Sequence, residues 1–187
     1  MEDIIIRDAT LEDARAILNI YRYYVENTAI SFEYSVPSLE EFRMRMRHTL
    51  EKYPYLVIVS GNEIVGYSYA GPFKERAAYD WACEMTIYLR HDVQGQGFGR
   101  KLYSAMERAL AKMGILNLYA CIAYPETEDD YLTRGSALFH QHVGYVKTGH
   151  FHKCGYKFDR WYDMIWMEKI LGEHKSPCRD VERYARD

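Results

Sequence analysis

Three glycines on alternate positions, Gly95, Gly97 and Gly99, are followed directly by two cations, Arg100 and Lys101. An amphipathic pattern typical of a helix begins at the same point. Glycine lets backbone amides turn toward an anion, and the start of a helix adds partial positive charge. The spacing therefore favours binding of a phosphate or pyrophosphate group. An ordinary tight turn between a strand and a helix would explain the same glycines.

Three known phosphate-binding patterns can be compared with this loop, and they differ in the spacing of their glycines. A P-loop requires GxxxxGK[ST], but the fifth residue after the first glycine is Arg100. A dinucleotide fold requires GxGxxG near the first strand of the chain, whereas here the pattern is GxGxG and lies much later. Glu126, after the following strand, leaves that alternative open. The third pattern, Q-x-x-G-x-G, is satisfied from Gln94 to Gly99.

Helices and strands alternate along the part of the chain that precedes this loop. Hydrophobic periodicity and the Ser/Thr-x-x-acid capping signature locate them. The expected elements are a strand over 4–7, two helices opened by Thr10-Asp13 and Ser38-Glu41, a hairpin of strands 55–60 and 64–71, and a strand over 83–89.

After the loop the alternation continues to about residue 171. The expected elements are a helix ending at Gly114, a central strand over 116–123, a short helix over 136–142, and strands over 145–151 and 161–169. We expect residues 1–171 to form one α/β (α+β) domain and residues 172–187 a polar C-terminal extension with room for a short helix.

Composition limits the class of protein. The chain has 187 residues, 48% of them hydrophobic, with a net charge of -3 and a pI near 6.2. A nucleic-acid partner is not expected, because it would require clustered positive charge. The four cysteines have no metal-ligand spacing and suit a reducing cytoplasm. No membrane span and no signal peptide are expected.

Several unusual segments occur in a recognisable order over about residues 3–171. They are "KYPYLV" (52–57), "YAGPFKERAAYDWACEMTIYL" (69–89), the glycine loop, and "CGYKFDRWYDM" (154–164). With the Q-x-x-G-x-G loop, the chain resembles the phosphinothricin and methionine sulfoximine acetyltransferase branch of the GNAT N-acetyltransferase superfamily. The statements in the next four paragraphs are what this resemblance implies.

The implied fold is the GNAT acyltransferase fold, a mixed twisted sheet of six to seven strands with flanking helices. Two central parallel strands splay apart to admit acetyl-CoA, which is the implied cosubstrate; no metal is implied. The backbone of residues 85–89 would pair with the pantetheine arm, and amides of residues 95–100 would hold the pyrophosphate. The implied cofactor-binding residues are Ile87, Tyr88, Leu89, Gln94, Gly95, Gln96, Gly97, Phe98, Gly99 and Arg100.

Two residues take the implied catalytic roles. Glu84 stands where the branch has its proposed base, which removes a proton from the attacking ammonium group. "FHQHVGY" aligns with an LHxxxGF/Y signature and places His140 as a general acid or as a neighbour of the leaving thiolate. A sheet glutamate in solvent and a structural histidine are the ordinary alternatives.

The implied substrate is a small amino-acid analogue with a primary amine. Arg76 and Tyr79 match the arginine and tyrosine of the branch's binding loop, and Phe32 matches a pocket-lining aromatic. A guanidinium can hold a carboxylate at two points. Each of the three residues would equally suit the surface or the core.

The chain also departs from the branch. Thr133 stands where an asparagine is usual, Phe158 replaces a polar residue, and "PETEDDYLTRG" (125–135) is an extra segment, by default a solvated acidic loop. The resemblance implies a homodimer formed through the C-terminal strands, with Trp161, Tyr162 and Trp166 as contributors. A second hypothesis is a sensor of the same fold that binds acyl-CoA without turnover.

Overall fold

One mixed β-sheet runs through the protein, seen here as a computed structural model that describes residues 3–93 and 95–186. Within these residues the sheet has seven strands in the order β1-β2-β3-β4-β5-β7-β6, and every neighbouring pair is antiparallel except β4 with β5. The strands are β1 (Ile4–Asp8), β2 (Tyr55–Ser60), β3 (Glu63–Pro72), β4 (Ala82–Leu89), β5 (Asn117–Tyr124), β6 (Val146–Lys157) and β7 (Arg160–Ile170). The predicted fold class is confirmed. A single parallel pair does not fit the mostly parallel sheet of a dinucleotide fold, so that alternative is wrong.

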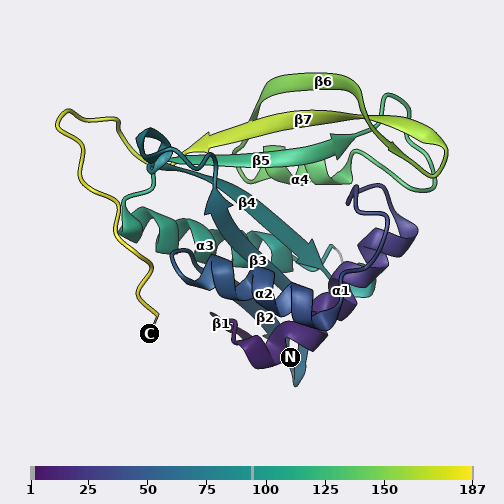
Figure 1. The fold of residues 1–187 in the computed structure, drawn as a ribbon, viewed down its shortest axis with the longest axis horizontal. Coiled ribbons are helices and arrows are strands. Elements are labelled where there is room, and N and C mark those ends of the chain that lie inside the picture. The colour runs from purple at the N-terminus through teal and green to yellow at the C-terminus, as the bar shows by residue number, and fades with distance from the viewer. Residues whose placement is uncertain (1–2, 94, 187) are drawn as a thin grey trace.

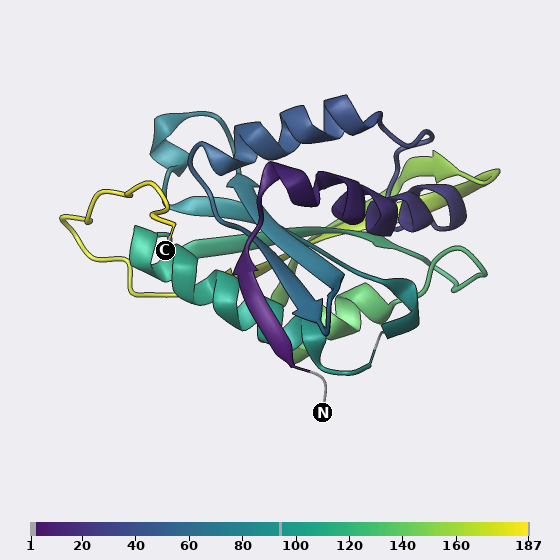
Figure 2. The ribbon, with the colours of Figure 1, turned by 90° about the horizontal axis from the view of Figure 1, so that it is seen from below.

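Helices cover both faces of the sheet (Figures 1 and 2). α1 (Ala14–Asn27) and α2 (Leu39–Leu50) lie on one face, and α3 (Phe98–Met113) and α4 (Gly135–His142) lie on the other. Each face has its own hydrophobic core, centred on Ile17, Tyr21 and Tyr67 on the first and on Leu102, Met106 and Leu118 on the second. None of the helices in residues 3–93 and 95–186 is both long and apolar enough to cross a membrane.

The two capping signatures open helices as predicted. The Thr10 N–H donates to Asp13 Oδ2 over 2.8 Å, and Ser38 Oγ accepts from the Glu41 N–H over 3.1 Å. The first signature opens a short 3-10 turn (Leu11–Asp13) that leads into α1. The remaining predicted elements match the observed bounds within about two residues, except at β6.

β6 ends six residues after its predicted end at residue 151. It is one of the two edge strands, so one of its flanks has no partner strand, and its sequence lacks a sustained hydrophobic alternation. A break in the register between Phe151 and Gly155 accommodates extra residues before pairing with β7 resumes. Such a bulge interrupts the period-two pattern from which strands are predicted.

The C-terminal segment differs from the predicted polar extension. Residues 172–186 contain no helix or strand, yet they run back along the domain beside α3 (Figure 2). The Glu182 N–H donates to the Met113 carbonyl over 2.9 Å, and the Tyr184 N–H donates to the Lys52 carbonyl over 3.0 Å. Val181 packs against the core on the α3 face. The segment is therefore docked on the domain by main-chain hydrogen bonds that its polar composition does not reveal.

Candidate active site

The parallel strands β4 and β5 form a fork. They pair only at Ala82 with Asn117, Cys83 with Leu118 and Glu84 with Tyr119, and beyond these pairs the strands separate. β4 continues to Leu89 beside β3, and β5 continues beside β7. The splayed parallel pair expected from the family resemblance is thus present, and it begins just after Glu84.

The register of β4 shows which of its backbone groups face the fork. The Arg90 N–H donates to the Val65 carbonyl on β3 over 2.8 Å. Because backbone groups alternate in direction along a strand, Tyr88 and Thr86 also direct theirs toward β3, while Ile87 and Leu89 direct theirs toward β5. The Leu89 carbonyl accepts a hydrogen bond from the Tyr24 hydroxyl. An extended ligand in the fork can therefore pair with the main chain at Ile87 and Leu89.

The glycine loop leads from β4 into α3, and its three glycines serve two different purposes. Gly95 and Gly97 both have φ near 79°, and a Cβ at either position would meet no described atom within 4 Å. At Gly99, by contrast, a Cβ would lie 3.0 Å from the Phe139 ring of α4. The first two glycines leave the amides at the start of α3 open to a ligand, as an anion site requires. The third allows α3 to approach α4. Gln94 lies outside the described residues.

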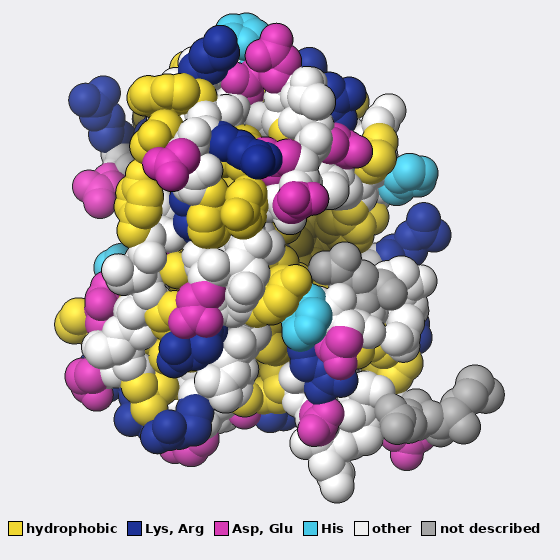
Figure 3. All heavy atoms as spheres, turned by 90° about the vertical axis from the view of Figure 1, so that its right-hand side faces the viewer, with side chains coloured by type: hydrophobic (Ala, Val, Ile, Leu, Met, Phe, Trp, Pro, Cys, Tyr) yellow, Lys and Arg dark blue, Asp and Glu magenta, His cyan; other side chains and the backbone are white. Residues whose placement is uncertain are grey.

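A pocket of about 270 Å³ occupies the fork. Its lining comes from β4, β5, the segment after α1, and the two helices on the far face; it includes Phe32, Glu84, Ile87, Tyr88, Tyr103, Cys121, Ser136, His140 and Met164. The fork opens toward the right of Figure 1, and the view from that side shows a hollow with a hydrophobic surface (Figure 3). The pocket opens to both faces of the sheet. We call the part of the pocket on each face the α1/α2 side and the α3/α4 side, after the helices that cover that face.

Glu84 lies on the α1/α2 side of the pocket. It shares a face of β4 with Tyr88, whose ring packs 5.0 Å from that of Tyr24 on α1. Burial raises the pKa of the Glu84 carboxyl, and the charge of Lys74 opposes that change. A carboxylate with a raised pKa accepts a proton more readily than an exposed one, which suits a general base.

His140 lies on the α3/α4 side and is only 4% exposed. Its Nδ1 lies 2.7 Å from the Ser136 carbonyl, which can only accept, so Nδ1 carries the proton. Nε2 is then an acceptor for the Tyr103 hydroxyl at 2.9 Å. Burial lowers the pKa of His140 to about 4. The imidazole is therefore neutral near pH 7 and holds the hydroxyl of Tyr103 at the pocket.

Phe32 reaches the pocket from the segment that follows α1, and two residues of β6 fix its position. The Lys157 ammonium is buried and donates to the carbonyls of Val25, Thr28 and Ser31 over 2.7 to 2.8 Å. These three bonds use all three of its donors. The Phe32 ring lies directly over Gly155, where a Cβ would be 2.2 Å from the ring.

The extra segment 125–135 is only partly solvated: Glu126, Glu128 and Asp130 are exposed as expected, but its hydrophobic residues pack on the domain. Leu132 is 2% exposed, and the Tyr131 carbonyl accepts a hydrogen bond from the Ala29 N–H over 3.0 Å. Tyr131 also stacks on Phe158 with ring centroids 4.1 Å apart. The two departures from the branch therefore contact each other, and together with Phe32 they form a small third hydrophobic cluster beside the pocket.

Arg76 and Tyr79 lie in the connection between β3 and β4, and both side chains are exposed. Among the described residues, neither belongs to the pocket lining. The cation of this connection that acts on Glu84 is Lys74. The substrate roles of Arg76 and Tyr79 remain predictions, whereas Phe32 does line the pocket.

Three residues near the pocket were missed by sequence reasoning. Lys74 stands two positions before Arg76, Tyr103 is on the buried face of α3, and Lys157 is in a segment quoted for the resemblance. Tyr103 could have been found from its position on the helical stripe of α3. A lone lysine such as Lys157 is usually exposed, so nothing local marks it as buried.

A splayed parallel pair with a glycine-rich helix start beside it defines an acetyltransferase of the acetyl-CoA-dependent class. Residues 6–166 match the acetyltransferase (GNAT) domain, and the chain belongs to this family. It is an acetyl-CoA-dependent N-acetyltransferase.

Relatives of this chain match it over nearly its whole length. It is 31% identical to a phosphinothricin N-acetyltransferase of Streptomyces viridochromogenes, over 94% of this chain and 92% of that protein. It is 28% identical to an L-methionine sulfoximine/L-methionine sulfone acetyltransferase of Salmonella typhimurium, over 92% and 97%. A solved phosphinothricin acetyltransferase from Sinorhizobium meliloti in complex with acetyl-CoA has a TM-score of 0.85 and 30% identity, covering 97% of this chain and 95% of that one.

Proposed function

We propose that this acetyltransferase acts on the α-amine of a small amino-acid analogue of the phosphinothricin or methionine sulfoximine type. The named activities of relatives at about 30% identity support this substrate class. The observation that carries the proposal is the pocket of about 270 Å³ in the fork, with Glu84 on its α1/α2 side. Its volume is close to the lower end of the range for small-molecule sites, which begins at about 300 Å³.

On the α1/α2 side, Glu84 takes a proton from the substrate ammonium, directly or through a water molecule. The neutral amine then attacks the thioester carbonyl carbon; the new C–N bond forms as the C–S bond breaks, and the second proton that the nitrogen loses goes to the leaving CoA thiolate. The main-chain N–H groups of Ile87 and Leu89 face the fork and can bind the pantetheine arm, or the oxygen that gains charge during attack.

The amides of residues 95–100 at the start of α3 bind the pyrophosphate of acetyl-CoA, with Arg100 adding charge. The open space at Gly95 and Gly97 supports this role. A pyrophosphate there is anchored by the backbone rather than by a particular side chain, and Gln94, Gln96 and Phe98 contribute through the loop's main chain.

On the α3/α4 side, the leaving thiolate needs a hydrogen-bond donor. His140 was predicted as a general acid or as a thiolate neighbour, and its lowered pKa favours the second role. The Tyr103 hydroxyl has one proton, which bonds to the neutral imidazole before transfer and turns to the leaving sulfur as the C–S bond breaks, releasing His140 Nε2. No metal takes part in this scheme.

Recognition of the substrate carboxylate belongs, in this proposal, to the connection that carries Lys74, Arg76 and Tyr79. Phe32 supplies the apolar wall. Arg76→Ala should raise the KM for amino-acid substrates. Unchanged kinetics would remove Arg76 from the site and leave Lys74 as the cation to test.

The deciding experiment is release of free thiol from acetyl-CoA in the presence of L-phosphinothricin, L-methionine sulfoximine or L-methionine sulfone. A matched amine that lacks the α-carboxylate serves as the control. Release with the amino-acid analogues and little with the control supports the proposal. Binding of acetyl-CoA without thiol release with any amine would contradict it and favour the sensor.

We also propose that the enzyme is a cytoplasmic homodimer. The four cysteines are free thiols, which suits a reducing compartment. Large exposed hydrophobic side chains on β6 and β7, including Val146, Phe151 and Trp161, suit an interface between two copies. Tyr162 cannot contribute as predicted, because it is buried in the third cluster. Light scattering on the purified chain tests the dimer.

A further inference from the structure

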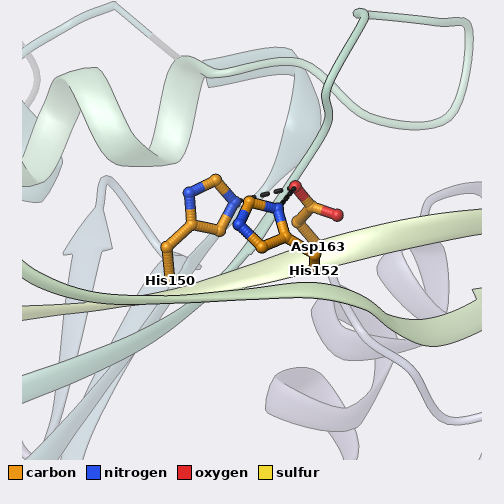
Figure 4. A group of neighbouring side chains, drawn as sticks. All are labelled: His150, His152 and Asp163. Atoms are coloured by element: carbon orange, nitrogen blue, oxygen red, sulfur yellow. Dashed lines mark hydrogen bonds and ion pairs between the residues drawn. The ribbon is translucent and has the colours of Figure 1, made fainter.

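Two histidines and an aspartate meet on the β6–β7 hairpin (Figure 4). His150 Nε2 lies 2.7 Å from Asp163 Oδ2, and His152 Nδ1 lies 3.4 Å from the same oxygen. The two imidazole rings are 4.2 Å apart between centroids. Within residues 3–93 and 95–186 this is the one group of three or more such side chains close enough to share a metal ion.

The strand geometry explains why these side chains converge. His150 and His152 are two positions apart on β6, so both point to one face of the strand, and Asp163 is on the neighbouring strand β7. The bulge of β6 begins here, and Lys153 has φ of 48°. Its N–H donates to Asp163 Oδ1 over 2.7 Å. One carboxylate oxygen is thereby fixed by the backbone, and the other faces the two imidazoles.

The carboxylate is also held in place for a metal. Asp163 is 5% exposed, and the Lys153 N–H donates to one of its oxygens. A buried carboxylate oriented by a main-chain donor resembles the second-shell arrangement that fixes ligands around metal ions in proteins.

We propose that His150, His152 and Asp163 form a binding site for Zn²⁺ or a similar divalent transition metal. Imidazole and carboxylate ligands suit this class of ion. Metal–ligand bonds of about 2.0 to 2.1 Å place tetrahedral ligand atoms about 3.3 Å apart. The distance from His152 Nδ1 to Asp163 Oδ2 already matches. His150 Nε2 must move about 0.6 Å away from Asp163 Oδ2 to reach the same separation. All three ligand atoms lie within 4.8 Å of one another.

The site leaves room for a water ligand and lies apart from the acetyl transfer. The His152 side chain is 74% exposed, so the fourth coordination position can face solvent. None of the three side chains lines the pocket, although Met164, next to Asp163 in sequence, does. The metal therefore fastens the bulge of β6 to β7, just before Gly155 and Lys157, and has a structural role. This inference does not depend on the identity of the amine substrate.

Metal titration of the full chain, stripped of metal and without a histidine tag, tests the proposal. We expect one Co²⁺ per chain with visible d–d absorption bands, displaced by Zn²⁺, and one Zn²⁺ per chain by calorimetry. His152→Ala should weaken binding by at least about 10-fold, which is what the loss of even an outer-shell partner costs a metal site. Because His152 is exposed, this variant should fold, and its melting temperature without metal verifies that.

Two control variants separate this site from other sources of metal affinity. His48→Ala removes an exposed histidine of α2 and should leave binding unchanged. Cys154→Ser removes the exposed thiol nearest to His152 in sequence and should also leave it unchanged. Asp163→Asn keeps an acceptor for the Lys153 N–H and should weaken binding like His152→Ala. No stoichiometric uptake by the wild-type chain, or uptake that survives His152→Ala, would overturn the proposal; the three side chains would then be an internal hydrogen-bond cluster.

Discussion

The two sides of the pocket are built in different ways. The α3/α4 side comes from two nearly continuous stretches, the glycine loop with α3 and the short helix α4. The α1/α2 side comes from β4 and the segment after α1, and contacts with the 125–135 segment and the end of β6 hold that segment in place. In the proposed function, the first side binds through main-chain groups and the second through side chains whose positions depend on distant contacts.

This difference has a physical consequence for specificity. A main-chain anion site depends on glycine conformation and helix direction, and it tolerates many side chains around it. A side-chain pocket changes whenever one of its supporting contacts changes. We therefore expect variants on the α1/α2 side to alter amine kinetics and variants of the glycine loop to alter acetyl-CoA kinetics.

The largest expected effect comes from Glu84→Gln. Loss of a general base costs about 10²- to 10⁴-fold in kcat/KM. The pKa of Glu84 is raised from 4.5, so the wild-type rate should climb as pH rises through that elevated pKa and the base becomes ionised. The variant should lose this dependence and be most impaired above that pKa, where wild-type Glu84 is ionised while the substrate amine is still protonated. Measuring kcat/KM against pH verifies both effects.

Glu75→Gln is the matched control for Glu84. Glu75 is exposed in the β3–β4 connection, and its substitution by glutamine changes the local charge by the same amount as Glu84→Gln. We expect it to keep the wild-type pH profile. If the two variants gave the same profile, Glu84 would act only through its charge.

Lys157→Met should produce the next largest effect. It removes three hydrogen bonds to carbonyls of the segment that carries Phe32, while the similar length of methionine preserves packing. We expect a loss of roughly 2–3 kcal/mol in the free energy of unfolding, because buried carbonyls lose a charged donor. The KM for the amine should rise while the KM for acetyl-CoA stays constant.

Lys153→Met is the control, since Lys153 lies on the same strand and uses its backbone, rather than its ammonium, in the contacts described above. It should leave both KM values unchanged. A Lys157→Met enzyme with an unaltered amine KM would show that the lysine stabilises the fold without positioning Phe32.

The sequence predicted the α3/α4 side more completely than the α1/α2 side. The helix after the glycine loop could be predicted because glycine spacing and hydrophobic periodicity are local signals, whereas the splayed strand pair was implied by the family resemblance. Lys157 and the stacking of Tyr131 on Phe158 could not, because each contact joins residues far apart in the chain. The same reason explains the docked C-terminal segment, whose anchoring bonds are made by the backbone.

Two glycine variants test separately the role of the glycine loop in ligand binding and its role in helix packing. Gly97→Ala is strained by about 1–2 kcal/mol at positive φ and should raise the KM for acetyl-CoA, with little change in the amine KM. Gly99→Ala would press against Phe139 and should lower the melting temperature instead. Phe139→Leu in the second variant should restore part of the stability. An equal effect of both variants on acetyl-CoA binding would show that Gly99 also contributes to the anion site.

The expected effect with the least bearing on the transfer rate is a pH dependence of stability due to His140. Its pKa falls from 6.5 to about 4 on folding, so the unfolded chain binds an additional proton between these values. Stability from this group is therefore complete above pH 6.5 and is lost as pH falls toward 4, by about 3 kcal/mol in total. Urea unfolding of wild type and His140→Gln over this range should show a shallower slope in the variant. His142→Gln changes an exposed histidine on the same helix and should keep the wild-type slope. Carboxylates that titrate in this range affect all three proteins alike, so they do not alter the comparison.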